Sequence, residues 1–470
     1  MSNTNAATPQ QELLQYSVDW NNVALQAITA GLDQIPVIGD LLSHLVFAFW
    51  PPSGEDIWGE IKQKVEALIN QAISQDDYDR VQAELGTAAQ DSGLIGVLNN
   101  YLGSVNPDPN QNNGMKPQPT WDSANQTFTF AQSAFQQDGI QLLLLPLFAQ
   151  FANMHLSLLR DGVKENWVND SELQSRIADY TKYVDDTYQQ GYATRASANK
   201  GFNYLNEYVQ YMQISVLNFR ETWPYFDPAK YPPPVKVTFT NQTYFTITGS
   251  LNRQCGNYTL PSIPTSAVTN IDVYWLEDLY DDYNVVLGTQ VNYADAQEPY
   301  TGVLIDNALP PINKPCDPNN DYFCYFKNSA GVSPNNPIVA VQGVYESTSG
   351  VYCVDFIYQN GSSTGQIPSQ NDQDYPLSYN IAPPQGYYLS SVWVPNDTFW
   401  YGSAVDMVFG FRYIPPAIDQ ETARALYVSS LHPVSQSDAR FAPFAAAAAS
   451  EDWEGQRQQF LSLIKGSAKS

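Results

Sequence analysis

Apolar residues recur every three or four positions in the first half of the chain and alternate with polar residues in the second half. The first pattern predicts helices, and the second predicts β-strands. The two parts meet at a proline-rich stretch, 224–234. The chain is therefore expected to be an α+β multidomain protein, with a helical domain over 1–230, an all-β domain over 235–415 and a short, partly helical tail over 416–470.

The helical pattern is divided by prolines, glycines and polar loops. Its segments run over 23–50 with a break at Pro36, 57–73, 76–104, 121–137, 139–160, 171–192 and 201–223. One of them, 139–160, differs from the rest because it is free of charge up to residue 159 and apolar on most sides. At about 1.5 Å per residue it could span a bilayer of about 30 Å. A helix of this kind is more often the centre of a soluble bundle, which is the interpretation we adopt for the resting protein.

The β pattern contains three similar units, each a strand, a connection and a second strand. They run over 270–293, 339–358 and 386–412. A threefold repeat favours a β body built from three similar parts, with loops at one end. An ordinary antiparallel sandwich is the alternative.

Charge and composition narrow the classes of partner. The chain has 470 residues, with 22 Lys and Arg against 48 Asp and Glu, for a net charge of −26 at pH 7. Such a surface repels phosphate backbones, so we expect no nucleic-acid partner. Hydrophobic residues make up 43% of the chain, which is too many for a disordered acidic protein. Because the first twenty residues lack the pattern of a signal peptide, we expect production inside the cell and release by another route.

Few residues are arranged for catalysis or metal binding. Nucleotide-binding and metalloprotease motifs are absent from the sequence, and His44, His155 and His432 lie on separate segments. The string GSSTG at 361–365 matches a serine-hydrolase elbow formally, but polar residues follow it instead of a helix, so we expect a turn there. We therefore expect no enzyme activity, no cofactor and no metal site.

The four cysteines lie in the second half of the chain and form no CxxC pair. Cys316 and Cys324 bracket a short loop that a disulfide could close. Cys255 and Cys353 could then form a second pair, and buried free thiols are an equally good interpretation.

Three dispersed blocks resemble a known family. FWPPSGEDIWGEIKQKVEALINQAI at 49–73, LPLFAQFANMHLSLLRDG at 145–162 and FNYLNEYVQYMQISVLNFRETWPYFDPAKYP at 202–232 are similar to helical blocks of the three-domain insecticidal δ-endotoxins, the Cry toxins, and occur in the family's order. The resemblance implies a seven-helix bundle around one apolar helix, here about 140–159, followed by a β-prism-like domain. It also implies a pore-forming toxin that binds a cell-surface receptor and inserts a helical hairpin into the target membrane.

The resemblance also assigns candidate site residues. The membrane-inserting residues would be Ile140, Leu142, Leu143, Leu144, Leu145, Leu147, Phe148, Phe151, Leu156, Leu158 and Leu159. The pore-lining candidates are Asn125, Thr127, Thr129, Gln132, Ser133 and Gln136. Receptor-binding loops carried over by position would present Tyr280, Asp281, Asp282, Tyr283, Ser347, Thr348, Asn396 and Trp400. The implied partners are a target-cell membrane, a glycan or glycoprotein receptor and further copies of this chain, and the implied form before release is a crystalline inclusion.

Two features depart from the family. The stretch after residue 416 is too short for the family's third domain, and the segment 121–137 lacks the charges common in the corresponding helix. A non-toxic glycan-binding or crystalline storage protein on the same fold is therefore the alternative function.

Overall fold

The computed structural model separates the chain into two compact units, which are described one at a time. Of the described residues, a helical unit holds those within 20–197 and 211–238, and a β unit holds those within 198–210 and 239–414. Within these units the structure describes residues 20–33, 39–50, 56–69, 71–86, 93–105, 115–198, 200–247, 264–279, 283–302, 311–312, 317, 321–347, 350–369, 376–395, 404 and 406–414.

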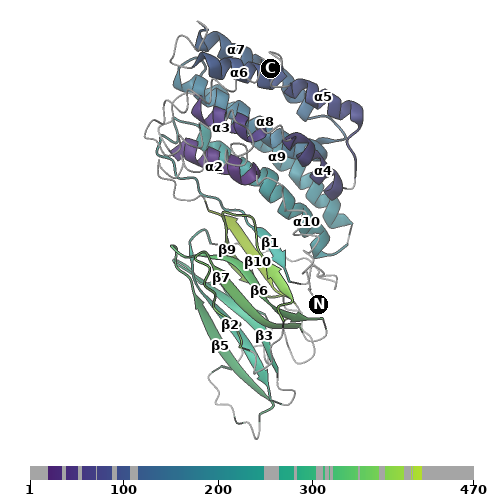
Figure 1. The fold of residues 1–470 in the computed structure, drawn as a ribbon, viewed down its shortest axis with the longest axis vertical. Helices are drawn as coiled ribbons and strands as arrows, with labels where there is room; N and C mark the ends of the chain where they lie inside the picture. Colours follow the sequence, from purple (N-terminus) through teal and green to yellow (C-terminus); the bar gives the residue numbers. More distant parts are fainter. Residues whose placement is uncertain are drawn as a thin grey trace, which may run out of the picture. The chain divides into compact units, whose positions relative to one another are not determined.

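Helices account for most described residues up to 226 (Figure 1). They are α2 (Trp20–Asp33), α3 (Asp40–Phe49), α4 (Ile57–Ile69), α5 (Gln75–Leu85), α6 (Gly93–Ser104), α7 (Pro117–Phe135), α8 (Gln141–Lys164), α9 (Asp170–Ser197) and α10 (Phe202–Met212). A π-helical turn η1 (Gln213–Leu217), α11 (Asn218–Thr222) and a 3₁₀ turn η2 (Trp223–Phe226) continue α10. The structure therefore confirms that the periodic segments of the first half of the chain form helices.

One predicted segment is wrong in detail. The periodic stretch 76–104 forms two helices, α5 and α6, instead of one. Gly86 ends α5 at a φ of +73°, and Gly93 precedes the rest of α6 at a φ of +79°. A side chain at Gly93 would meet the backbone of Gly86, at 2.8 Å from its Cα. The two glycines allow a positive φ and a close backbone approach, so the chain breaks there despite the continuous apolar spacing.

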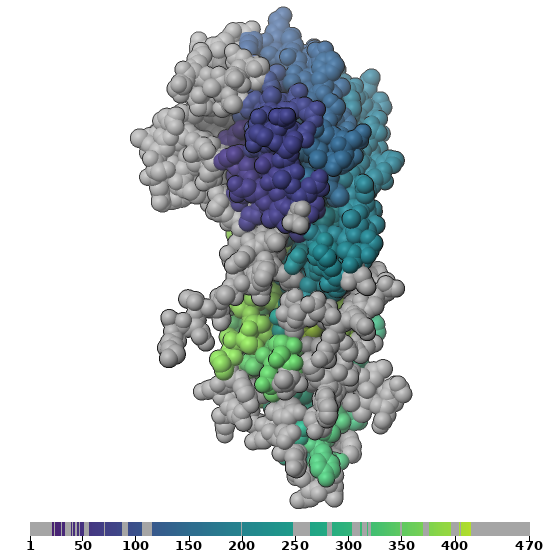
Figure 2. Space-filling view, turned by 90° about the vertical axis from the view of Figure 1, so that its right-hand side faces the viewer, coloured from purple at the N-terminus to yellow at the C-terminus, as the bar shows by residue number. Residues whose placement is uncertain are grey.

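α8 lies at the centre of the helical unit. It contacts α3, α4, α7, α9 and the η1–α11–η2 segment, and every residue from 143 to 162 is buried. The helices around it turn apolar faces inward, as Ile57, Ile61, Val65 and Leu68 of α4 do. Figure 2 shows one face of this unit, with its surface coloured from purple to teal along the sequence. The expected bundle around an apolar central helix is confirmed.

The β unit contains three antiparallel sheets in the described residues (Figure 1). The first has the order β1 (Thr243–Thr246), β10 (Val408–Tyr413), β9 (Tyr387–Trp393). The second has the order β4 (Thr301–Gly302), β3 (Tyr283–Tyr293), β2 (Val268–Asp278), β5 (Phe323–Gly331). The third has the order β7 (Gly350–Tyr358), β6 (Ile338–Glu346), β8 (Tyr379–Ile381). The three predicted sequence units are the pairs β2–β3, β6–β7 and β9–β10, one in each sheet.

Each sheet also carries a glycine beside a tyrosine. Added methyl groups at Gly288 and Gly343 would lie within 2.5 Å of the hydroxyls of Tyr300 and Tyr379, and Gly410 pairs directly with Tyr244. A tyrosine ring can cover a strand glycine that has no side chain of its own to pack. Because all three sheets share this glycine–tyrosine arrangement, the structure supports the threefold interpretation of the sequence over the sandwich alternative.

Candidate functional site

α7 and α8 form an antiparallel helical hairpin joined by a short turn at 136–140. Gly139 adopts a φ of +85° in this turn, which a glycine tolerates without strain. Buried α7 residues face α8: the ring centroids of Phe128 and Phe135 lie 5.2 Å and 4.8 Å from that of Phe151. The Trp121 indole donates to the Leu158 carbonyl at 2.7 Å. Aromatic packing and a backbone hydrogen bond thus hold the two helices together.

The predicted membrane-inserting residues follow α8 and the turn before it. Ile140 and Leu142 are half-buried, and the other nine residues of that set are fully buried. Within the described residues, α8 is the helix that is long and apolar enough to cross a membrane, with 94% of its apolar window buried. The central helix of a soluble bundle meets the same criteria, so its length and composition leave its role in a membrane open.

Five of the predicted pore-lining residues, Asn125, Thr129, Gln132, Ser133 and Gln136, follow one face of α7, and Thr127 lies on the other side. Thr129 and Ser133 are exposed, while Thr127 and Gln136 are half-buried. Asn125 points to α8, since its Oδ1 lies 2.9 Å from Nε2 of His155. Gln132 turns toward α9, where its Oε1 accepts a hydrogen bond from Arg176 at 3.2 Å. In the resting bundle this set is therefore divided between solvent and neighbouring helices.

The polar side chains of α8 are a feature that the site prediction passed over. Gln150, Asn153, His155, Ser157, Arg160 and Asp161 are all buried. Asn153 donates to Gln150 at 2.8 Å and accepts from the indole of Trp223 at 2.8 Å. The Nδ1 atom of His155 lies 2.6 Å from the Tyr180 hydroxyl. Without His155, these residues recur at steps of three or four, and that spacing was the sequence signal for a polar face on this helix.

Arg160 and Asp161 tie the end of α8 to the first helices of the unit. Arg160 donates to the Gly31 carbonyl at 3.3 Å. Asp161 accepts from the Gly39 N–H at 2.9 Å and from the Tyr101 hydroxyl at 3.1 Å. These contacts join α8 to α2, to the start of α3 and to α6.

Three hairpin connections of the β unit meet at one place. The N–H of Ala404, between β9 and β10, donates to the Val286 carbonyl at 2.8 Å, just after the β2–β3 turn. The N–H of Val351, just after the β6–β7 turn, donates to the Ala404 carbonyl at 3.0 Å. The structure thus brings the bases of the three predicted receptor-binding loops together.

The tips of these loops are only partly described. Ser347 is exposed, next to Glu346, whose carboxylate accepts from Tyr352 at 2.9 Å. Tyr283 is the first residue of β3. The other predicted receptor-binding residues, Tyr280, Asp281, Asp282, Thr348, Asn396 and Trp400, lie outside the described residues.

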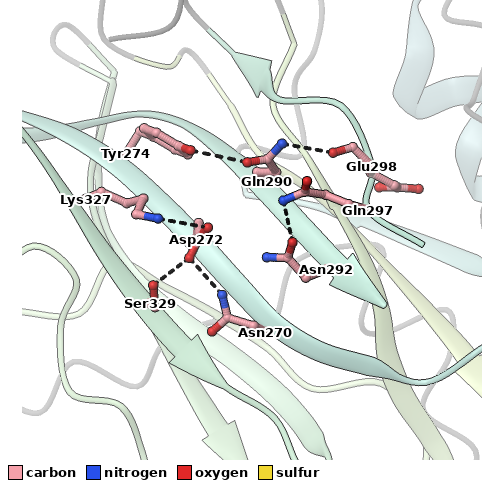
Figure 3. A network of polar contacts seen from close by, with 9 residues as sticks. All are labelled: Asn270, Asp272, Tyr274, Gln290, Asn292, Gln297, Glu298, Lys327 and Ser329. Carbon is pink, nitrogen blue, oxygen red and sulfur yellow. Dashed lines mark hydrogen bonds and ion pairs between the residues drawn. The ribbon is translucent and has the colours of Figure 1, made fainter. Parts of the chain in front are cut away.

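A polar network covers part of the second sheet (Figure 3). Asp272 on β2 accepts hydrogen bonds from Asn270 at 2.7 Å and from Ser329 on β5 at 2.5 Å, and it pairs with Lys327 at 3.2 Å. Burial alone would raise the pKa of Asp272, but these contacts outweigh it and lower the pKa. The network cross-links β2 and β5 beside the β3–β4 connection, where Gln290 donates to the Glu298 carbonyl at 3.2 Å.

Glu298 gives the β unit a pH-dependent stability. Its side chain is 8% exposed, and burial raises its pKa to about 7, against a smaller lowering by Tyr293. The folded state therefore binds this proton more tightly than the unfolded chain, whose carboxyl has a pKa near 4.3. The resulting stabilisation is full below about pH 4 and is lost as the pH rises from there to about 7.

We expect Glu298→Gln, which keeps the site neutral, to remove this dependence. At pH 4 the variant and the wild type should have equal free energies of unfolding, and at pH 8 the variant should be more stable by up to about 3 kcal/mol. Urea unfolding followed by tryptophan fluorescence at the two pH values measures the difference. An equal effect at both pH values would contradict this origin.

The structure also bears on the cysteines, the string 361–365 and the acidic and histidine side chains. Cys353 is a buried free thiol, so the second disulfide alternative is wrong. Cys324 is in a disulfide, and Cys316 lies outside the described residues, so their pairing stays a prediction. The string 361–365 forms the expected turn, with Gly361 at a φ of +82°. No group of three His, Cys, Asp or Glu in the described ranges is placed to hold a metal ion.

Comparison with known proteins finds relatives of this chain by sequence similarity. Residues 27–227 match the family model for the delta endotoxin N-terminal domain. The chain is 29% identical over 239 residues to the pesticidal crystal protein Cry2Ad of Bacillus thuringiensis, an alignment that covers 47% of this chain and 36% of the relative. The chain thus spans about a third of the length of the curated relatives it matches.

Two solved structures show the same fold at low sequence identity. The insecticidal crystal protein Cry7Ca1 of Bacillus thuringiensis has a TM-score of 0.62 at 17% identity, covering 85% of this chain and 75% of that one. The structure of PirB has a TM-score of 0.61 at 14% identity, covering 84% of this chain and 95% of that one. In both cases the likeness extends over most of this chain.

Proposed function

We propose that this chain is a pore-forming toxin of the delta-endotoxin type, which binds a receptor on a target cell and inserts the α7–α8 hairpin into its membrane. The main support for the proposal is α8, a 24-residue, mostly apolar helix that is surrounded by amphipathic helices. At about 1.5 Å per residue it extends to about 36 Å, enough for a bilayer core of about 30 Å. The proposal assigns no catalytic step.

Insertion would move one hairpin from the protein interior into the lipid of the membrane. In water, the apolar surface of α8 must be covered by neighbouring helices. In a membrane, lipid tails can cover it, and a helix satisfies its own backbone hydrogen bonds. α7, with its aromatic contacts to Phe151, would accompany α8 as a hairpin, and several copies would enclose a water-filled lumen. The relatives are named crystal proteins, and we extend to this chain an inclusion stored inside the producing cell.

Receptor binding is assigned to the end of the β unit where the three hairpin connections meet. The hydrogen bonds of Ala404 to Val286 and Val351 hold the loop bases together. Loops on a rigid sheet scaffold are a common arrangement for recognition. A glycan or glycoprotein is the proposed receptor class.

The insertion step can be tested by a reversible cross-link. Gln132 on α7 and Arg176 on α9 are hydrogen-bonded partners, so Gln132→Cys with Arg176→Cys places two thiols across the boundary of the hairpin. We expect a short reducible cross-linker between them to abolish dye release from membrane vesicles prepared from a panel of insect cells. Reduction should restore the release to the wild-type level.

A second pair provides the matched control. Asp185 on α9 and Arg220 on α11 form an ion pair outside the hairpin. Cross-linking Asp185→Cys with Arg220→Cys by the same reagent should leave dye release unchanged. Release that persists with α7 fixed to α9 would overturn hairpin insertion. Wild-type protein that releases dye from no vesicle, with or without protease treatment, would favour the binding or storage protein.

A further inference from the structure

The hydrogen bonds of α8 sort into two groups by partner. One group stays within the α7–α8 hairpin: Nε2 of His155 with Asn125, and the Leu158 carbonyl with Trp121. Nδ1 of His155 also contacts the Tyr180 hydroxyl on α9, so this residue has a partner inside the hairpin and one outside it. The other group reaches the rest of the helical unit. It comprises Gln150 to the Ser215 carbonyl at 3.5 Å, Asn153 to Trp223, Arg160 to the Gly31 carbonyl, and Asp161 to Gly39 and Tyr101.

The α8 residues of the second group lie on one face of the helix together with Ser157, and we call this face the α8 stripe. It consists of Gln150, Asn153, Ser157, Arg160 and Asp161, at steps of three or four residues that keep side chains on one face. His155 is two residues from both Asn153 and Ser157, and two residues turn an α-helix by about 200°. The contact of His155 with α7 therefore places the stripe on the side of α8 that faces away from α7.

Part of this stripe has no hydrogen-bond partner within the part of the chain that the structure describes. Ser157 and Arg160 are each 1% exposed. Among the described residues, the Ser157 hydroxyl and the Nε and Nη2 atoms of Arg160 have no hydrogen-bond partner. Burying unpaired polar groups is costly, and native proteins leave few of them. Water would satisfy these groups in a state that exposes this face of α8.

Insertion of the hairpin would separate the two groups of hydrogen bonds. The α7 contacts move with α8, but apart from the Asn153–Gln150 bond within α8 itself, the hydrogen-bond partners of the stripe belong to segments outside the hairpin. Lipid cannot satisfy a guanidinium, a carboxylate, amides and a hydroxyl, and such groups in membranes face a bundle interior or water. We propose that the α8 stripe lines the aqueous lumen of the pore, with Arg160 as a charged ring within it. This inference rests on the proposed function.

Thiol accessibility in open channels tests the stripe. The variants Ser157→Cys and Asn153→Cys place a thiol on it, and Ala152→Cys, also buried in α8, places one on the opposite side. We expect a charged methanethiosulfonate, added to open channels in planar bilayers, to reduce the single-channel conductance of Ser157→Cys and Asn153→Cys by more than twofold. The conductance of Ala152→Cys and of the wild type should not change.

A variant without an added cysteine gives a second, independent measurement. Neutralising the proposed ring with Arg160→Gln should raise the permeability ratio of cations over anions at least twofold, as measured by the reversal potential in a salt gradient. Unchanged selectivity, together with block of Ser133→Cys on α7 but of neither stripe cysteine, would overturn the inference and leave α7 as the lining helix. Wild-type protein without channels would instead overturn the proposed function on which it rests.

Discussion

Replacing Phe151 by alanine is expected to lower the free energy of unfolding of the helical unit by about 3–5 kcal/mol. Phe151 is fully buried in α8. Its ring centroid lies within 6.2 Å of those of Phe128, Phe135, Phe148, His155 and Tyr180. Removing the ring loses the free energy of burying it. It also leaves a cavity that the aromatic neighbours on α7, α8 and α9 cannot fill completely. Guanidinium unfolding followed by helical circular dichroism measures the loss.

Phe130 on α7 is the matched control for this substitution. Its side chain is 71% exposed, so Phe130→Ala should change the free energy of unfolding by no more than about 0.5 kcal/mol. If both variants lost similar stability, the aromatic cluster around Phe151 would not be the core of the unit. A small loss for Phe151→Ala alone would contradict the central place of α8.

The architecture of both units follows from local sequence patterns. The charge-free run 139–159 identified the central helix, because a helix that is apolar on most sides must be buried. Alternating strands and repeated connections identified the pairs that form the three sheets. Periodicity failed at Gly86 and Gly93, where backbone conformation and close approach override apolar spacing.

The polar contacts of α8 could not be predicted in the same way. Arg160 meets Gly31 across 129 residues of sequence, and Asp161 meets Gly39 across 122. No local pattern encodes such pairs, since they depend on how the helices pack. Asn125 shows the same limit: it fits a polar face of α7 in sequence, and the fold turns it toward His155.

The second large effect is expected in the β unit, at Gly343 on β6. Tyr379 on β8 lies over this glycine and donates to the Cys353 carbonyl at 2.9 Å. A methyl group at Gly343 would lie 2.2 Å from that carbonyl oxygen and 2.4 Å from the Tyr379 hydroxyl. Gly343→Ala must therefore displace a backbone group or break the hydrogen bond, and we expect a loss of about 2–4 kcal/mol.

Gly331→Ala is the control for the general effect of replacing a glycine in a strand, as distinct from the clash at Gly343. It lies at the exposed end of β5, and no atom comes within 4 Å of an added methyl group. Gly331→Ala should stay within about 0.5 kcal/mol of the wild type in urea unfolding followed by tryptophan fluorescence. Because Tyr379→Phe removes the hydrogen bond but keeps the ring, adding it to Gly343→Ala should recover part of the loss. No recovery would place the strain at the Cys353 backbone, and a neutral Gly343→Ala would contradict the close packing of β8 on β6.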